Sequence, residues 1–164
     1  MVISKDFDKF KLEAKKKRKE NNKFFERLKK EKSGVLHDKF LQEHQKVFAC
    51  TDCLKCANCC KTTGPLFTQK DIERIASHLK LKPGAFVEKY LRIDEDQDYV
   101  LQKVPCVFLG EDNYCSIYEH RPKACREYPH TDSPKIQQLL KITSKNLEIC
   151  PAVHEIVEGL KLLY

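Results

Sequence analysis

Five of the nine cysteines in this 164-residue chain fall within eleven residues, in the pattern Cys50-x-x-Cys53-x-x-Cys56-x-x-Cys59-Cys60. These thiols cannot all pair as disulfides, because a disulfide requires a particular separation of its two Cα atoms. Two-residue spacing instead lets a tight loop turn successive thiolates towards one ion, with backbone N–H groups facing the sulfurs. The segment therefore predicts metal ligands. Buried, inert cysteine is the simpler interpretation for Cys50 alone, which ends a predicted helix.

Four more cysteines follow the cluster, and together with its core they give eight candidate ligands. The candidate metal ligands are Cys53, Cys56, Cys59, Cys60, Cys106, Cys115, Cys125 and Cys150. Eight thiols suffice for two four-thiolate sites, or for one site and a redox-active pair. Adjacent cysteines such as Cys59 and Cys60 usually point in different directions, so they could serve two sites or line one site from two sides.

The spacing fits iron and zinc alike, because both bind thiolates well. Iron–sulfur clusters use a Cys-x-x-Cys-x-x-Cys run with a distant cysteine followed by proline, and Cys53, Cys56, Cys59 and Cys150-Pro151 offer that set. The fourth cysteine lies about ninety residues away. Cysteines at the two ends of a predicted hairpin, Cys106 and Cys115, resemble zinc-ribbon geometry instead. We expect iron, as an iron–sulfur cluster or an ion, ahead of zinc.

The positive charge is confined to the N-terminal fifth of the chain. Residues 1–32 contain thirteen Lys or Arg and six Asp or Glu, whereas residues 33–164 contain eighteen of each. The net charge of +7 therefore belongs to the first segment. Such an arm could contact an anionic partner such as RNA, DNA, an acidic protein or a membrane surface. A solvated helical face is the favoured interpretation, because acidic residues alternate with the lysines.

No apolar run approaches the ~20 residues that span a bilayer, and the N-terminus lacks the apolar core of a signal peptide. We therefore expect a cytoplasmic protein. Disulfides are rare in that reducing compartment, which again favours cysteines as metal ligands.

Hydrophobic periodicity predicts an α+β fold, mostly α, with helices around a small antiparallel β-hairpin and a cysteine-rich loop over 50–64. A basic helix over 4–31 forms an N-terminal segment, residues 1–32, and residues 33–164 form the cysteine-cluster domain. Thr68 and Asp71 match a capping box, and Pro83 suits the first turn of a helix. Further helices are expected over 35–48, 84–91 and 134–147, at Pro122, and after Pro151. The predicted hairpin joins strands at 99–104, 106–109 and 114–118 through a turn at 110–113.

Three groups of residues carry a resemblance to a known family. They are Cys53-x-x-Cys56-x-x-Cys59-Cys60, then Pro105-Cys106-Val107-Phe108-Leu109, then the stretch from Cys115 through Arg121-Pro122 and Cys125 to Tyr128-Pro129. Together they resemble the YkgJ family of cysteine-cluster proteins, described as zinc- or iron-chelating, over roughly residues 50–151. Residues 128–132 and the long first helix resemble the version found in Bacteroidota. The resemblance implies the same eight cysteine ligands, but it supplies no reaction.

Other residues near the cluster have two interpretations each. Arg121 and Arg126 could donate hydrogen bonds to sulfurs, bind an anion, or pair with carboxylates. His120 and His130 could ligate metal, although supporting or surface roles are expected where thiolates are plentiful.

The sequence leaves three classes of function. The first is a metal-binding accessory protein in redox chemistry or metal handling, with a protein partner. The second is an RNA- or ribosome-associated protein that uses residues 1–32 on phosphates. The third is an enzyme, for which the sequence offers no catalytic motif, phosphate loop or paired carboxylates. The domain is similar to one in flagellin lysine-N-methylase, but the chain lacks a glycine-rich cofactor motif.

Overall fold

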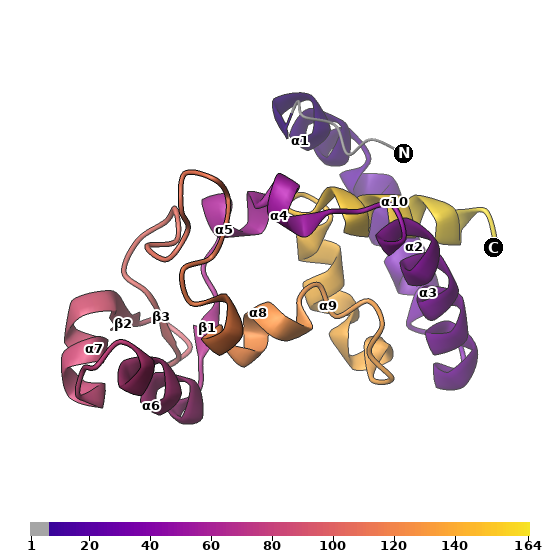
Figure 1. Cartoon of the computed structure of the whole chain (residues 1–164). Coiled ribbons are helices and arrows are strands. Elements are labelled where there is room, and N and C mark those ends of the chain that lie inside the picture. The colour runs from indigo at the N-terminus through magenta and orange to yellow at the C-terminus, as the bar shows by residue number, and fades with distance from the viewer. Residues whose placement is uncertain (1–6) are drawn as a thin grey trace. The chain divides into compact units, whose positions relative to one another are not determined.

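A computed structural model describes residues 7–164, and Figure 1 shows its elements. The chain is mostly helical with one small antiparallel sheet, which confirms the predicted α+β class. It forms two compact units. We call the first, which runs to Cys56 and resumes at Pro129–Tyr164, the helical unit. We call the second, Ala57–Tyr128, the sheet unit. None of the helices in residues 7–164 has the length and apolar character that crossing a bilayer requires.

The helical unit is built on four long helices around one apolar core. Its elements are α1 (Phe7–Lys16), α2 (Arg18–Leu28), α3 (Ser33–Phe48), the short α4 (Cys53–Cys56), α9 (Ile136–Asn146) and α10 (Pro151–Lys161). Helix α3 packs against α9 and α10, and α2 packs against α9. Phe40 of α3 and Ile156 of α10 are fully buried in this core. Pro151 at the start of α10 confirms the predicted helix start, since proline lacks the N–H that the first turn leaves unpaired.

The predicted basic helix is divided at Lys17, which separates α1 from α2. Helical hydrogen bonds continue through this residue, from Lys17 N–H to the Glu13 carbonyl and from Asn21 N–H to the Lys17 carbonyl. Phe24, Phe25 and Leu28 of α2 are buried with α3 and α10. These contacts place α2 in the helical unit, and the predicted domain boundary at residue 32 stays a prediction.

The sheet unit surrounds a three-stranded antiparallel sheet with short helices. Its elements are α5 (Asn58–Thr62), β1 (Leu66–Phe67), α6 (Gln69–His78), α7 (Pro83–Tyr90), β2 (Leu91–Ile93), β3 (Tyr99–Leu101), the 3-10 turn η1 (Tyr118–His120) and α8 (Lys123–Glu127). Strand β3 is central, with Val100 opposite Leu66 of β1 and Arg92 of β2. The capping box at Thr68 and the proline at the start of α7 are confirmed.

The hairpin does not lie where the sequence placed it. The observed hairpin joins β2 to β3, whereas the segment that carries Cys106 and Cys115 has only one bridge, between Leu109 and Cys115. The predicted turn exists, with Gly110 N–H bonded to the Tyr114 carbonyl at 2.8 Å. Pro105 has no N–H to donate, and Cys106 N–H donates to the Cys60 carbonyl at 2.8 Å. That bond fastens the segment to α5 in place of a strand partner. The predicted loop over 50–64 likewise contains the helical turns α4 and α5.

Candidate metal centre

The fold divides the nine cysteines between the two units, and none forms a disulfide. Cys50, Cys53, Cys56 and Cys150 belong to the helical unit, and Cys59, Cys60, Cys106, Cys115 and Cys125 belong to the sheet unit. The run of closely spaced cysteines is therefore split between Cys56 and Cys59. Its two halves belong with different distant cysteines.

In the sheet unit, four cysteines come from four separate segments. Cys60 lies on α5, Cys106 follows Pro105, Cys115 lies at the Leu109 bridge, and Cys125 lies on α8. Each is partly buried. The hydrogen bond from Cys106 N–H to Cys60 holds the first two segments together, and the bridge holds the third beside the second.

The pKa of Cys125 shows that these four sulfurs influence one another. Burial and the negative charges of the Cys60, Cys106 and Cys115 thiolates raise the pKa of Cys125 to about 12, against an opposing effect of Arg121. Once deprotonated, these four groups would repel one another. A bound cation would offset that repulsion and favour the thiolate forms.

Backbone N–H groups face two of these sulfurs. Burial raises the pKa of Cys106 to about 11, while the N–H groups of Phe108 and Leu109 favour its thiolate. Burial also raises the pKa of Cys115, whereas the hydrogen bond from the Ile117 N–H group lowers it. The cysteine spacing predicted N–H groups directed at sulfurs within residues 50–64, whereas these N–H groups belong to residues 108, 109 and 117.

Cys59 and Cys60 form a close pair with their Sγ atoms 3.9 Å apart. The hydrogen bond with Cys59 lowers the pKa of Cys60 to about 7, assisted by the charge of Lys61 and opposed by burial. Among Cys60, Cys106, Cys115 and Cys125, Cys60 is therefore the thiol most readily converted to thiolate near neutral pH.

In the helical unit, Cys150 is associated with two members of the closely spaced run. Burial raises the pKa of Cys150 to about 11, and the charges of Cys56 and Cys53 raise it further. Cys150 immediately precedes α10, and the N–H groups of Ala152 and Val153 in the first turn partly offset the effect of burial. The fold thus brings Cys53, Cys56 and Cys150 into one environment.

Cys50 is exposed just beyond α3, where its N–H donates to the Val47 carbonyl. No interaction with another cysteine is recorded for it among residues 7–164, which agrees with its omission from the candidate ligands.

Within residues 7–164, no three Cys, His, Asp or Glu side chains are already arranged to hold a metal ion. The donor chemistry nevertheless fits zinc or iron, because both bind thiolates and the sheet unit supplies four partly buried thiols that affect one another's pKa. Four sulfurs must converge to ~2.3 Å from a zinc ion. We therefore expect the thiol side chains to move together when metal binds.

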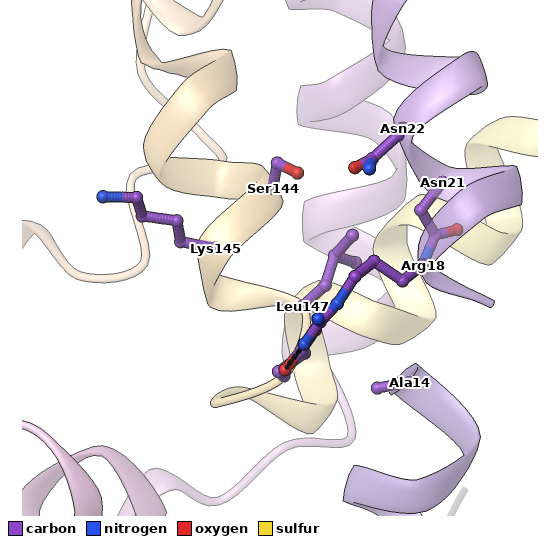
Figure 2. Close-up of a pocket in the computed structure, with 8 residues that line it drawn as sticks. Ala14, Arg18, Asn21, Asn22, Ser144, Lys145 and Leu147 are labelled. Atoms are coloured by element: carbon purple, nitrogen blue, oxygen red, sulfur yellow. Dashed lines mark hydrogen bonds and ion pairs between the residues drawn. The ribbon is translucent and has the colours of Figure 1, made fainter. Parts of the chain in front are cut away.

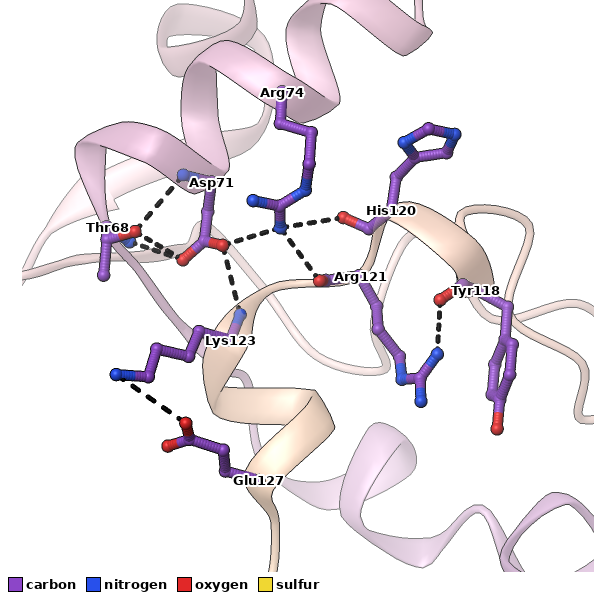
Figure 3. A network of polar contacts seen from close by, with 8 residues as sticks. All are labelled: Thr68, Asp71, Arg74, Tyr118, His120, Arg121, Lys123 and Glu127. Atoms are coloured by element: carbon purple, nitrogen blue, oxygen red, sulfur yellow. Dashed lines mark hydrogen bonds and ion pairs between the residues drawn. The ribbon is translucent and has the colours of Figure 1, made fainter.

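A polar network centred on Asp71 fastens the segment carrying Cys125 to α6, as Figure 3 shows. The Asp71 carboxylate is 1% exposed. It accepts hydrogen bonds from the Thr68 hydroxyl at 2.7 Å, from Arg74 at 2.7 Å and from Lys123 N–H, in the first turn of α8, at 3.1 Å. The same Arg74 nitrogen donates to the carbonyls of His120 and Arg121.

The sequence indicated Asp71 only as part of a capping box and did not indicate its bond to α8. Burial alone would raise the pKa of Asp71, but hydrogen bonds from Thr68, Arg74 and Lys123 hold it below its usual value. The carboxylate therefore stays charged and fixes the start of the helix that carries Cys125.

The side chains of Arg121 and His120 have partners other than sulfur. Arg121 donates to the Tyr118 carbonyl at 2.6 Å and lies over the Tyr118 ring. His120 stacks on His78 with ring centroids 4.0 Å apart. Arg121 still influences the site electrostatically, because its charge favours the thiolates of Cys115 and Cys125.

Comparison with known families places these cysteines in a recognised domain. A family model, CxxCxxCC, described as a "Putative zinc- or iron-chelating domain", matches residues 52–151. The chain belongs to the CxxCxxCC family. This confirms the resemblance to the YkgJ proteins and supports metal binding, with zinc or iron as the metal. The likeness to a Bacteroidota version stays a prediction.

The matched residues of the family extend across both units and include all eight candidate ligands. An uncharacterized protein of Methanocaldococcus jannaschii is 34% identical over 82 residues, which are 48% of this chain and 44% of that protein. The alignment thus spans less than half of that relative. The comparison with solved structures gave no match.

Proposed function

We propose that the protein binds iron through two groups of cysteine thiolates and acts as an accessory factor in redox chemistry or metal handling. The sheet-unit group is Cys60, Cys106, Cys115 and Cys125, with Cys59 beside Cys60. The helical-unit group is Cys53, Cys56 and Cys150. Iron would be held as an iron–sulfur cluster or as an ion, and zinc is the alternative metal.

The proposal rests on the effect that three other thiolates have on the pKa of Cys125. Cys60, Cys106 and Cys115 all disfavour ionisation of Cys125. Binding a metal requires ligand thiols to be deprotonated, and the metal charge converts their mutual repulsion into attraction.

The helical-unit group supports iron over zinc. Cys53, Cys56 and Cys150-Pro151 are three of the four positions that an iron–sulfur run would use, and the charges of Cys53 and Cys56 act on Cys150. Three thiolates leave a coordination position for a ligand from elsewhere, which suits a protein that exchanges metal or electrons with a partner. An independent catalytic activity has no comparable support.

The decisive experiment is anaerobic purification of the full chain, followed by iron, zinc and acid-labile sulfide analysis and an absorption spectrum. We expect a coloured protein with iron, and sulfide if a cluster is present. A colourless protein with stoichiometric zinc would contradict the iron proposal and make the thiolate groups structural. A protein that retains neither metal after anaerobic handling and reconstitution would contradict metal binding altogether.

The matched control is Cys50→Ser, because Cys50 is exposed and lies outside both groups. It removes one thiol without touching a proposed ligand, so metal content should stay at the wild-type level. A fall in metal content similar to that caused by Cys106→Ser would show that the ligands have been assigned wrongly.

A further inference from the structure

We propose that the helical unit carries an RNA-binding surface, formed by exposed lysines of α1, α2 and α9 around a polar pocket. We call it the basic surface. Its lysines are Lys15, Lys16, Lys19, Lys23, Lys141 and Lys145. This role is separate from metal binding, since no cysteine belongs to the surface.

Three of the six acidic residues in the first 32 positions are paired with cations outside the basic surface. Glu20 binds Lys161 of α10 at 2.5 Å, and Glu31 binds Lys39 of α3 at 3.7 Å. Glu26 pairs with Lys29 at 2.5 Å. These three carboxylates are therefore not ion-paired with the lysines of the basic surface.

The lysines of the basic surface have no such partners. All six are exposed, and no ion pair or side-chain hydrogen bond is recorded for them in the part of the chain that the structure describes. Two basic residues between Lys16 and Lys19 differ in this respect. Lys17 binds Glu158 at 2.5 Å, and Arg18 binds Glu148 at 2.7 Å. The unpaired charges accordingly remain available to an external anion.

A pocket of about 310 Å³ is lined by residues of α1, α2 and α9, and Lys145 is the one lysine of the basic surface that lines it. Figure 2 shows α2 and α9 on its two sides, with Arg18 and Asn22 on one and Ser144 and Lys145 on the other. Glu148 binds Arg18 through two hydrogen bonds, at 2.7 and 2.8 Å, and so fixes the guanidinium at the pocket. Lys19 and Lys23 each follow a lining residue of α2, about 100° further around the helix. Their side chains therefore lie off the pocket-facing side of α2 and place positive charge on its exposed face.

The side chains around the pocket suit RNA better than other anionic partners. Phosphates are bound by lysine, and the neutral Asn22 and Ser144 can hydrogen-bond a ribose 2′-hydroxyl, which DNA lacks. A lipid surface would need the apolar face of α1 and α2, but Phe10, Phe24 and Phe25 are buried.

The test measures binding of the metal-loaded full chain to a labelled 20-nucleotide single-stranded RNA, to DNA of the same sequence, and to vesicles with anionic lipid. The variant is Lys19→Gln/Lys23→Gln/Lys145→Gln. The control, Lys70→Gln/Lys82→Gln/Lys103→Gln, removes the same charge from exposed positions of the sheet unit.

We expect the first variant to weaken RNA binding at least tenfold and the control to change it less than twofold. The slope of log affinity against log salt should fall in magnitude by about 2, since each phosphate contact contributes about 0.7 on a single strand. Metal content should be unchanged in both variants, which separates this result from the proposed metal function.

Four outcomes would overturn the proposal. The first is equal loss of RNA binding in both triple variants, which would indicate a general charge effect. The second is equal affinity for RNA and DNA, and the third is binding to anionic vesicles alone. The fourth is the absence of RNA binding by the wild-type chain at low salt.

Discussion

The two units differ in how much of their structure depends on their cysteines. The helical unit buries long helices against one another, and its three candidate ligands lie at α4 and just before α10. In the sheet unit, residues 102–117 form no helix and only the Leu109–Cys115 bridge, yet they carry two of its thiols. The first unit can rely on apolar burial. The second has a stretch whose order we expect to depend on metal.

The largest expected effect comes from removing one ligand in each unit. Cys125→Ser should remove metal from the sheet unit and destabilise it by several kcal/mol, on the order of half of the ~10 kcal/mol that structural metal supplies. Cys150→Ser should remove metal from the helical unit alone. Metal analysis combined with chelator competition measures both. Complete loss of metal in either variant would show that the two groups share one site.

Next in size are two core truncations. Phe40→Ala in the helical unit and Phe86→Ala in the sheet unit each delete a fully buried ring, which costs about 3–5 kcal/mol. Denaturant unfolding with and without chelator should show a metal-independent loss for Phe40→Ala. For Phe86→Ala, metal should restore part of the stability. Equal metal dependence of the two variants would remove the proposed difference between the units.

Asp71→Asn should destabilise the sheet unit by about 1–3 kcal/mol, because a buried charged acceptor of several hydrogen bonds is lost. The folded pKa of Asp71 is lowered, so its contribution is complete above about pH 4, the unfolded value. That contribution disappears as the pH falls through the folded pKa, and the variant should lose less stability on acidification.

The control for Asp71→Asn is Glu127→Gln, which removes an exposed carboxylate 3.6 Å from Lys123. It should change stability by less than about 1 kcal/mol. Cobalt-loaded protein provides a second measurement, because thiolate-to-metal absorption reports how many sulfurs bind. An unchanged spectrum and unchanged chelator resistance in Asp71→Asn would exclude a role for Asp71 in positioning Cys125.

The smallest effect is expected from Glu148→Gln. It removes an ion pair with Arg18, whose side chain is 59% exposed, so stability should change by less than about 1 kcal/mol. Thermal unfolding measures this change. A loss above 2 kcal/mol would mean that the pair supports the packing of α2 on α9.

Local signals in the sequence predicted the helices well. The capping box at Thr68 and the prolines at residues 83 and 151 each marked a helix start, because capping and proline geometry depend on neighbours in the chain. The hairpin prediction was wrong in position because strand-like composition cannot say which partner a segment has. Cys106 donates its N–H to Cys60, forty-six residues earlier, and that preference is not visible locally.

The sequence by itself determined that this chain carries a cysteine cluster of metal-binding type, that most of it is helical, and that its charge lies at the N-terminus. Two-residue cysteine spacing and helix periodicity are properties of consecutive residues, so they can be recognised without a fold. Only the tertiary structure decided that the closely spaced run divides, with Cys53 and Cys56 acting on the pKa of Cys150 and Cys60 acting on that of Cys125. Such grouping depends on contacts between residues far apart in sequence, which the packing of each unit fixes.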